Sequence, residues 1–175
     1  MKYFPLVILF TLFTSDVSAC SFAGVKLFRP TLDRWEQHPG PAQLNPDTGG
    51  NYWEPVPKPV VKNITITRAS YKGGSSCNDS GVISFTVYLP NSSSYELSEF
   101  GVYFHVTDGV MPDMIFPDLP LIGIAKGNEM TFVFPWLDQR PSIQKPLNLV
   151  VEARLITNGL DLGEAMTFRI EQIDG

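Results

Sequence analysis

Apolar and polar residues alternate along several short segments in the C-terminal two thirds of the chain. In residues 83–89, isoleucine, phenylalanine, valine and leucine alternate with serine, threonine and tyrosine. The same period of two recurs at residues 60–67, 102–106, 130–136, 147–155 and 166–170, and a shorter apolar piece lies at 121–124. This period predicts β-strands that bury one face and expose the other.

The alternation also assigns individual side chains to faces. In residues 102–106 it directs Tyr103 and His105 outward, because they alternate with apolar neighbours. In the first segment it places four side chains together on the face that we expect to be buried: Val60, Lys62, Ile64 and Ile66.

Turn-forming residues separate these segments, among them Gly73-Gly74, Asp108-Gly109 and Asn158-Gly159. Short strands with one apolar face each need one another to bury those faces, and no helical period interrupts them. The sequence therefore predicts an all-β fold, a single antiparallel β-sandwich of about seven strands over residues 60–175.

The first residues have the pattern of a secretory signal. Lys2 precedes an apolar run at residues 4–13, and Val17-Ser18-Ala19 supplies the small residues of a cleavage site. The run is too short to span a bilayer as a stable helix. We therefore expect a signal peptide at residues 1–19 and a mature chain that begins at Cys20. We also expect export to the periplasm or cell envelope.

Residues 20–59 are expected to form an irregular arm between the signal peptide and the sandwich. Prolines recur between positions 30 and 59, which excludes a long helix and a central strand there. Trp35, Tyr52 and Trp53 are large side chains that usually find a surface to cover. We expect this Pro-rich and Gly-rich arm to pack on the sandwich.

Cys20 and Cys77 are the two cysteines of the chain, and Cys20 has two interpretations. Two cysteines in an exported chain favour a disulfide, which stabilises a fold by roughly 4 kcal/mol for a loop of this size. Val17-Ser18-Ala19-Cys20 also resembles a bacterial lipobox, in which acyl chains on Cys20 would hold the domain at a membrane. The apolar residues after Cys20 are untypical of a polar tether and favour the disulfide.

Composition narrows the classes of partner. The 175 residues contain 13 Lys and Arg against 18 Asp and Glu, which gives a formal net charge of −5. The sequence contains no cluster of basic residues that would indicate binding to nucleic acid or to an anionic membrane surface. We expect contact with a membrane only if Cys20 is lipidated.

Motifs for catalysis are missing from the sequence. It contains no Gly-x-Ser-x-Gly, no His-Glu-x-x-His and no glycine-rich phosphate loop. Its two histidines, His38 and His105, lie far apart in the chain, one in the arm and one in a strand. We therefore expect a protein without enzymatic activity and without a cofactor.

One combination of residues suits a metal. His105, Met111 and Met114 lie within ten residues and join an imidazole to two thioethers, a ligand set that copper prefers. Methionines more commonly fill gaps beneath loops. No metal is therefore our first expectation, and copper at these three residues is the alternative.

Aromatic side chains are the stronger functional lead. Trp35, Tyr52 and Trp53, with the outward residues Tyr88 and Tyr103, are candidates for a platform that stacks on sugar rings or contacts a protein. Alternatively, the tryptophans of the arm cover an open edge or face of a sheet. The sequence leaves both interpretations open.

Two segments carry a family resemblance. Residues 149–154, followed by Asn158-Gly159 and Gly163-Glu164-Ala165, resemble the final hairpin of fibronectin type III-like domains, and residues 83–90 resemble their second strand. The likeness covers residues 60–173 and implies an immunoglobulin-like sandwich that binds, spaces or scaffolds. We therefore expect an exported, non-catalytic envelope or interaction module with a protein or glycan partner. A ligand-binding module, for carbohydrate or less favourably for copper, is the alternative.

Overall fold

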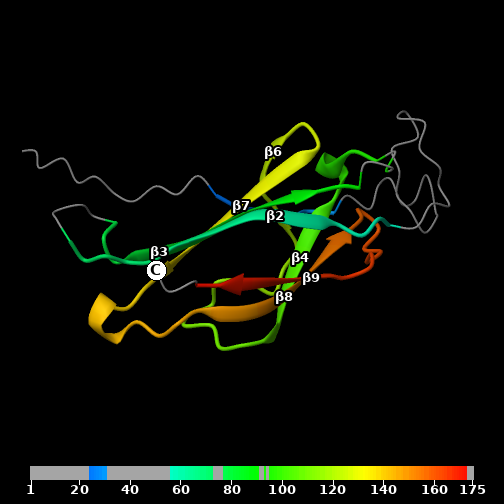
Figure 1. Ribbon diagram of the computed structural model, residues 1–175. Helices are drawn as coiled ribbons and strands as arrows, with labels where there is room; N and C mark the ends of the chain where they lie inside the picture. Colours follow the sequence, from blue (N-terminus) through cyan, green and yellow to red (C-terminus); the bar gives the residue numbers. More distant parts are fainter. Residues whose placement is uncertain (1–23, 31–55, 73–76, 91–92, 94, 173–175) are drawn as a thin grey trace, which may run out of the picture.

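The structure is a computed structural model, and it describes residues 24–30, 56–72, 77–90, 93 and 95–172. The strands of these ranges are β1 (Lys26–Leu27), β2 (Val60–Thr67), β3 (Ser80–Tyr88), β4 (Gly101–Asp108), β5 (Leu121–Ile122), β6 (Ile124–Lys126), β7 (Glu129–Leu137), β8 (Asn148–Ile156) and β9 (Met166–Glu171). Two 3-10 turns, η2 (Leu97–Glu99) and η3 (Pro141–Ile143), join them, and the described residues include no α-helix (Figure 1).

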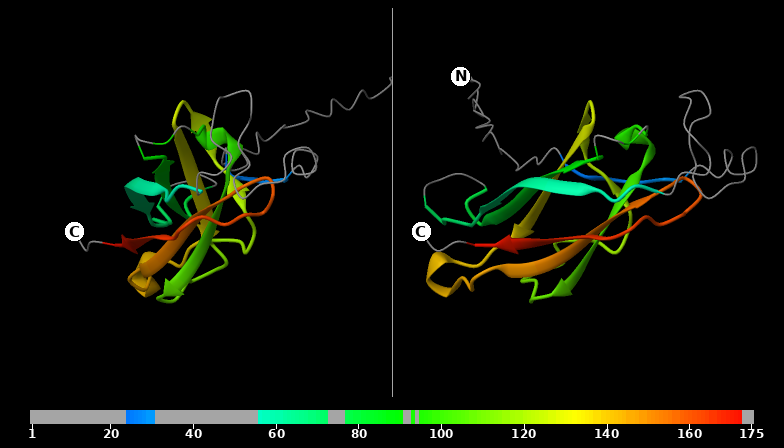
Figure 2. Two further views of the ribbon diagram at one scale, coloured as in Figure 1. Left: turned by 90° about the vertical axis from the view of Figure 1, so that its right-hand side faces the viewer. Right: turned by 45° about the vertical axis from the view of Figure 1, so that its right-hand side comes forward.

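The strands form two antiparallel sheets that pack face to face (Figure 2). Sheet A has the order β1-β5-β4-β8-β9, and sheet B has the order β2-β3-β7-β6. The prediction of an all-β antiparallel sandwich is confirmed. The order is compatible with an immunoglobulin-like fold, in which the first, second, fifth and fourth strands share one sheet.

The described residues contain nine strands instead of the expected seven, for two reasons. One described part of the arm, residues 24–30, contributes the short edge strand β1, which pairs with β5. The apolar piece 121–124 divides at Gly123, so that β5 belongs to sheet A and β6 to sheet B. A Cβ atom at Gly123 would lie 2.3 Å from the carbonyl oxygen of Thr131, so only glycine allows the chain to change sheets there.

The faces assigned to β2 were partly wrong. Val61, and not Val60 or Lys62, faces the core at this end of the strand. The pairing with β3 shifts between Lys62 and Thr65, and Asn63 between them has a φ of 55°. Such a bulge adds one residue and reverses the alternation, so that Ile64 packs toward the core beyond it.

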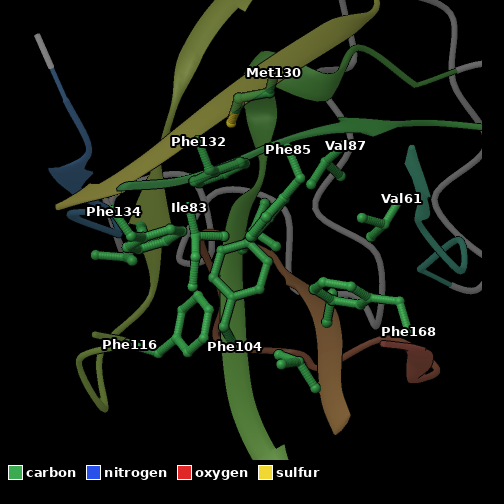
Figure 3. Close-up of a cluster of buried hydrophobic side chains, with 14 of the residues drawn as sticks. Val61, Ile83, Phe85, Val87, Phe104, Phe116, Met130, Phe132, Phe134 and Phe168 are labelled. Atoms are coloured by element: carbon green, nitrogen blue, oxygen red, sulfur yellow. The ribbon is translucent and has the colours of Figure 1, made fainter. Parts of the chain in front are cut away.

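Phenyl rings from both sheets fill the centre of the sandwich (Figure 3). Phe85 of β3 lies with its ring centroid 5.1 Å from that of Phe104 in β4 and 5.2 Å from that of Phe168 in β9. Phe116, from the loop before β5, packs edge-on against Phe134 at 4.7 Å. Because these contacts cross between the layers, burial of the rings holds sheet A against sheet B.

A buried ion pair holds one end of the sandwich together. The guanidinium group of Arg68, just after β2, donates to both carboxylate oxygens of Asp138, just after β7, at 2.7 and 2.9 Å. The Asp138 side chain is fully buried and that of Arg68 is 12% exposed. Arg68 also donates to the side chain of Gln172, which follows β9, so the pair links sheet B to the last strand of sheet A.

Further donors surround the carboxylate of Asp138. The backbone N–H groups of Ala69 and Gln139 donate to it at 3.0 and 2.8 Å, and the side-chain amide of Gln144 donates at 3.2 Å. Burial disfavours the charged form of this carboxyl, but the bonds from Arg68, Ala69 and Gln139 outweigh burial and lower its pKa. Asp138 is therefore ionised and fully bonded at neutral pH.

Candidate functional site

The outward side chains of β4, β8 and β9 form the outer face of sheet A. The strand register places Tyr103 opposite Arg154 and His105 opposite Glu152. On the other side of β8, Glu152 stands opposite Thr167 of β9. The predicted outward direction of Tyr103 and His105 is confirmed, because Tyr103 is half-buried and His105 exposed while Phe104 between them is buried.

A shallow hollow of about 270 Å³ lies on this face. We call it the Tyr103 hollow. It is lined by Tyr103, His105, Glu152, Arg154 and Leu162. Leu162 belongs to the hairpin that joins β8 to β9 and is 57% exposed. The hollow thus brings an aromatic ring, an imidazole, a cation, an anion and an apolar side chain together in reach of solvent.

Polar contacts hold the side chains that line the hollow. Arg154 donates to the carboxylate of Glu152 at 3.2 Å and to the carbonyl oxygen of Gly163 at 3.3 Å. The Tyr103 hydroxyl donates to the carboxylate of Asp118, in the loop before β5. This hydrogen bond, with partial burial and the negative charge of Asp118, raises the pKa of Tyr103. Tyr103 is therefore neutral at neutral pH, with its hydroxyl bonded to Asp118.

The hairpin beside the hollow is also held by internal hydrogen bonds. The Thr157 hydroxyl oxygen accepts from the backbone N–H groups of Gly159 and Asp161 at 3.2 and 3.1 Å. Leu160 has a φ of 70°, and its side chain is 53% exposed. The hairpin therefore presents two leucines, Leu160 and Leu162, to solvent on an ordered turn.

The three residues considered for copper have different surroundings. His105 lines the Tyr103 hollow. Met111 packs against the core and lines a separate hollow of about 480 Å³ that includes Arg68, and Met114 is 79% exposed. Among the described residues there is no group of three or more His, Cys, Asp or Glu side chains that could hold a metal. Copper binding by an imidazole and thioethers stays a prediction.

The two described tyrosines of the candidate platform, Tyr88 and Tyr103, line different hollows. Tyr103 lies on the outer face of sheet A, whereas Tyr88 belongs to sheet B. Tyr88 lines its own hollow of about 380 Å³, in which the Lys62 ammonium lies 5.6 Å from its ring centroid. These two tyrosines therefore belong to different sheets, and the aromatic platform stays a prediction. The candidate platform residues Trp35, Tyr52 and Trp53 lie outside the described residues.

The cysteine predictions fall partly outside the described ranges. Cys77 precedes β3 and is described, but Cys20 and the expected signal peptide at residues 1–19 are not. The disulfide, the lipidation and the boundaries at 19/20 and 59/60 stay predictions. Within the described part of the chain, no helix is long and apolar enough to cross a membrane.

Three members of the Tyr103 hollow were absent from the sequence-based candidates. Glu152 and Arg154 alternate outward in their strand, so their exposure was predicted but their neighbours were not. Their position opposite His105 and Tyr103 depends on the register of β4 with β8. Leu162 comes from a hairpin with no period, so no pattern in the sequence indicated it.

Comparison with protein-family models, with curated proteins and with solved structures finds no match for this chain.

Proposed function

We propose that this protein is an exported, non-catalytic interaction module that binds a protein partner through the outer face of sheet A. The observation that supports this proposal is the Tyr103 hollow, in which Tyr103 and Arg154 lie beside the exposed side chain of Leu162. Tyrosine and arginine are the side chains that most often dominate the binding energy of protein interfaces.

The contacts within the hollow suit recognition. Tyr103 and Arg154 are already held by Asp118 and by Glu152, so little conformational entropy is lost when a partner binds. Leu162 supplies apolar area at the rim, and the charges of Arg154 and Glu152 select the orientation of the partner. We expect the partner to insert one apolar or aromatic side chain among these groups.

Site-specific photo-cross-linking in the native host tests the proposal. A photoreactive amino acid replaces Leu162 in one variant and Leu137 in a matched control. Both leucines are exposed, by 57% and 69%, but Leu137 ends β7 in sheet B. We expect a discrete cross-linked product of higher mass from position 162 only. Equal products from both positions, or a product from position 137 alone, would contradict binding through sheet A.

We further infer that the sandwich is immunoglobulin-like and related in architecture to fibronectin type III domains. The sheet β2-β3-β7-β6 corresponds to the strand order A-B-E-D of immunoglobulin constant-type domains, and β4-β8-β9 corresponds to C-F-G. An experimental structure of the mature protein tests this assignment. A different connection between the sheets would refute it.

Export and the state of Cys20 form a separate part of the proposal. We propose a mature chain that begins at Cys20 and carries a Cys20–Cys77 disulfide in the periplasm or cell envelope. The intact mass of the protein from its own host tests this. A chain lighter by two hydrogens supports the disulfide, whereas added glyceride and acyl groups would show a lipoprotein at a membrane.

A ligand-binding module is the second candidate, and the Tyr88 hollow on sheet B favours it. There the Tyr88 ring lies with Lys62, Lys126, Asn128 and Glu129, which is the mixture of an aromatic ring and polar groups that sugars require. If carbohydrate binds in this hollow, Tyr88→Ala should weaken its binding and Tyr103→Ala should not. If the wild-type protein binds no member of a broad glycan panel, this function is excluded.

A further inference from the structure

β9 is an edge strand of sheet A. Within the described residues it pairs with β8 alone, so its other edge is open in this part of the chain. β2, which ends sheet B, lies close to β9 (Figure 1). The two edge strands flank a groove of about 370 Å³, lined by Ile64, Ile66, Arg169, Glu171 and Gln172. An open edge of this kind is a template for another strand.

The hydrogen-bond ladder determines which backbone groups face the open edge. The N–H of Gln172 donates to the carbonyl oxygen of Leu147 at 2.9 Å, one position beyond the paired strands. Bonded and non-bonded pairs alternate in an antiparallel ladder. Thr167, Arg169 and Glu171 therefore direct their backbone N–H and C=O groups away from β8 and toward the open edge.

The charges on this strand are self-complementary in one register. Arg169 and Glu171 are exposed, and within the described residues neither forms an ion pair. If two copies of β9 pair antiparallel about Ile170, each Arg169 stands opposite the Glu171 of the other copy. Pairing about Arg169 or about Glu171 would instead place like charges opposite each other, which is unfavourable.

We propose that two copies of this protein associate through their β9 edges, in an antiparallel pair centred on Ile170. The pairing joins two five-stranded sheets into one continuous sheet of ten strands. The added strand also covers the groove at Ile64 and Ile66, which are half-buried in one copy. The interface is isologous, so both copies contribute the same groups. This inference goes beyond the proposed function and does not depend on it.

Sedimentation velocity of the mature protein over a concentration series tests the interface. We expect a concentration-dependent equilibrium between monomer and dimer for the wild-type protein. Arg169→Glu and Glu171→Arg, each alone, should lower the association constant by about tenfold or more, because two opposite-charge pairs become two like-charge pairs. The double variant with both changes restores the pairs and should recover the wild-type association constant.

A matched control reverses a charge elsewhere. Glu96→Arg changes an exposed residue just before η2, which contacts β7 of sheet B, and should leave the association constant unchanged. Circular dichroism of each variant verifies that the sandwich is folded. A wild-type protein that is monomeric at every concentration would overturn the proposal. An association constant that stays low in the double variant would overturn it as well, because only this register places the two exchanged charges opposite each other.

Discussion

The interior of the sandwich and the outer face of sheet A are built from the same strands, but their side chains are held in different ways. On β4, Phe104 is 2% exposed and contacts phenyl rings of sheet B, whereas its neighbour His105 points to solvent. On β8, Ala153 is completely buried, whereas Arg154 makes one ion pair and one bond to a backbone carbonyl. One step along a strand therefore separates the groups that stabilise the fold from the groups that we propose to bind.

This difference implies that the outer face can be altered without unfolding the protein. Burial of apolar side chains, phenyl rings among them, between the sheets is the main favourable contribution to stability, and the Arg68–Asp138 pair lies at one end of this core. The polar contacts of the outer face are partly exposed, so solvent weakens them. The predictions that follow test this division, from the largest expected effect to the smallest.

Phe85→Ala should have the largest effect. Phe85 is fully buried and lies within 6 Å of four other rings, from both sheets: Phe104, Phe132, Phe134 and Phe168. Its removal leaves a cavity and should lower the free energy of unfolding by about 3–5 kcal/mol, measured by denaturant titration. Phe85→Leu keeps most of the volume and should cost less. Equal losses for both variants would mean that packing at this position does not hold the sheets together.

Asp138→Ala should destabilise the protein by about 3–5 kcal/mol, because it leaves the mostly buried guanidinium group of Arg68 without its carboxylate. The double variant Arg68→Met, Asp138→Leu removes both charges and should lose less than Asp138→Ala alone. The free energy of unfolding of each variant measures this. A greater loss in the double variant would contradict the assignment of the effect to an unpaired charge.

The pH dependence of stability should reflect the same pair. The pKa of Asp138 is lowered in the folded protein, so its charge stabilises the fold above the ordinary aspartate pKa of about 4. This contribution is lost as the pH falls through the lowered pKa. The difference in unfolding free energy between the wild type and Asp138→Asn should be constant at neutral pH and shrink under acid conditions. A difference that does not change with pH would contradict this.

Arg154→Ala should have a small effect on stability, about 1 kcal/mol or less, because its ion pair with Glu152 is partly exposed. Thermal unfolding followed by circular dichroism measures the change. Lys26→Ala, at an exposed position of β1 in the same sheet and without an ion pair in the described residues, is the matched control. A loss as large as that of Asp138→Ala would place Arg154 among the groups that hold the fold.

Asp118→Asn should leave stability almost unchanged but alter Tyr103. The hydrogen bond to the Asp118 carboxylate is the main cause of the raised pKa of Tyr103. Its replacement by an amide should lower that pKa toward the ordinary tyrosine value. An absorbance titration of the phenolate against pH in the two proteins, with Tyr103→Phe to identify the signal, measures the shift. An unchanged titration would show that Asp118 does not hold this side chain.

The sequence predicted the strands well where the backbone is regular. A period of two identified the buried faces of β3, β7, β8 and β9, because each of these strands lies against the same core. It failed where the backbone departs from a flat strand, at the bulge around Asn63 and at the change of sheets at Gly123. Asparagine tolerates a positive φ and glycine marks close approaches, but neither residue alone specifies such a departure.

The candidate site was less predictable because it depends on register. Alternation directs Glu152 and Arg154 outward, but it does not identify the neighbours that pairing with β4 provides. The Arg68–Asp138 pair joins residues 70 positions apart at one end of sheet B, where β2 and β7 flank β3, so local sequence carries no signal for it. The side chains of one strand were therefore predictable, and contacts between strands were not.

The central claim, that the outer face of sheet A binds a partner and does not hold the fold, is tested most directly by combining two changes. The photoreactive residue at position 162 is introduced together with Arg154→Ala, and the yield of cross-linked product is compared with that of the position 162 variant alone. Our account predicts a strongly reduced yield in a protein whose melting temperature is nearly unchanged, since Arg154 lines the same hollow as Leu162. An unchanged yield in the folded double variant would contradict it.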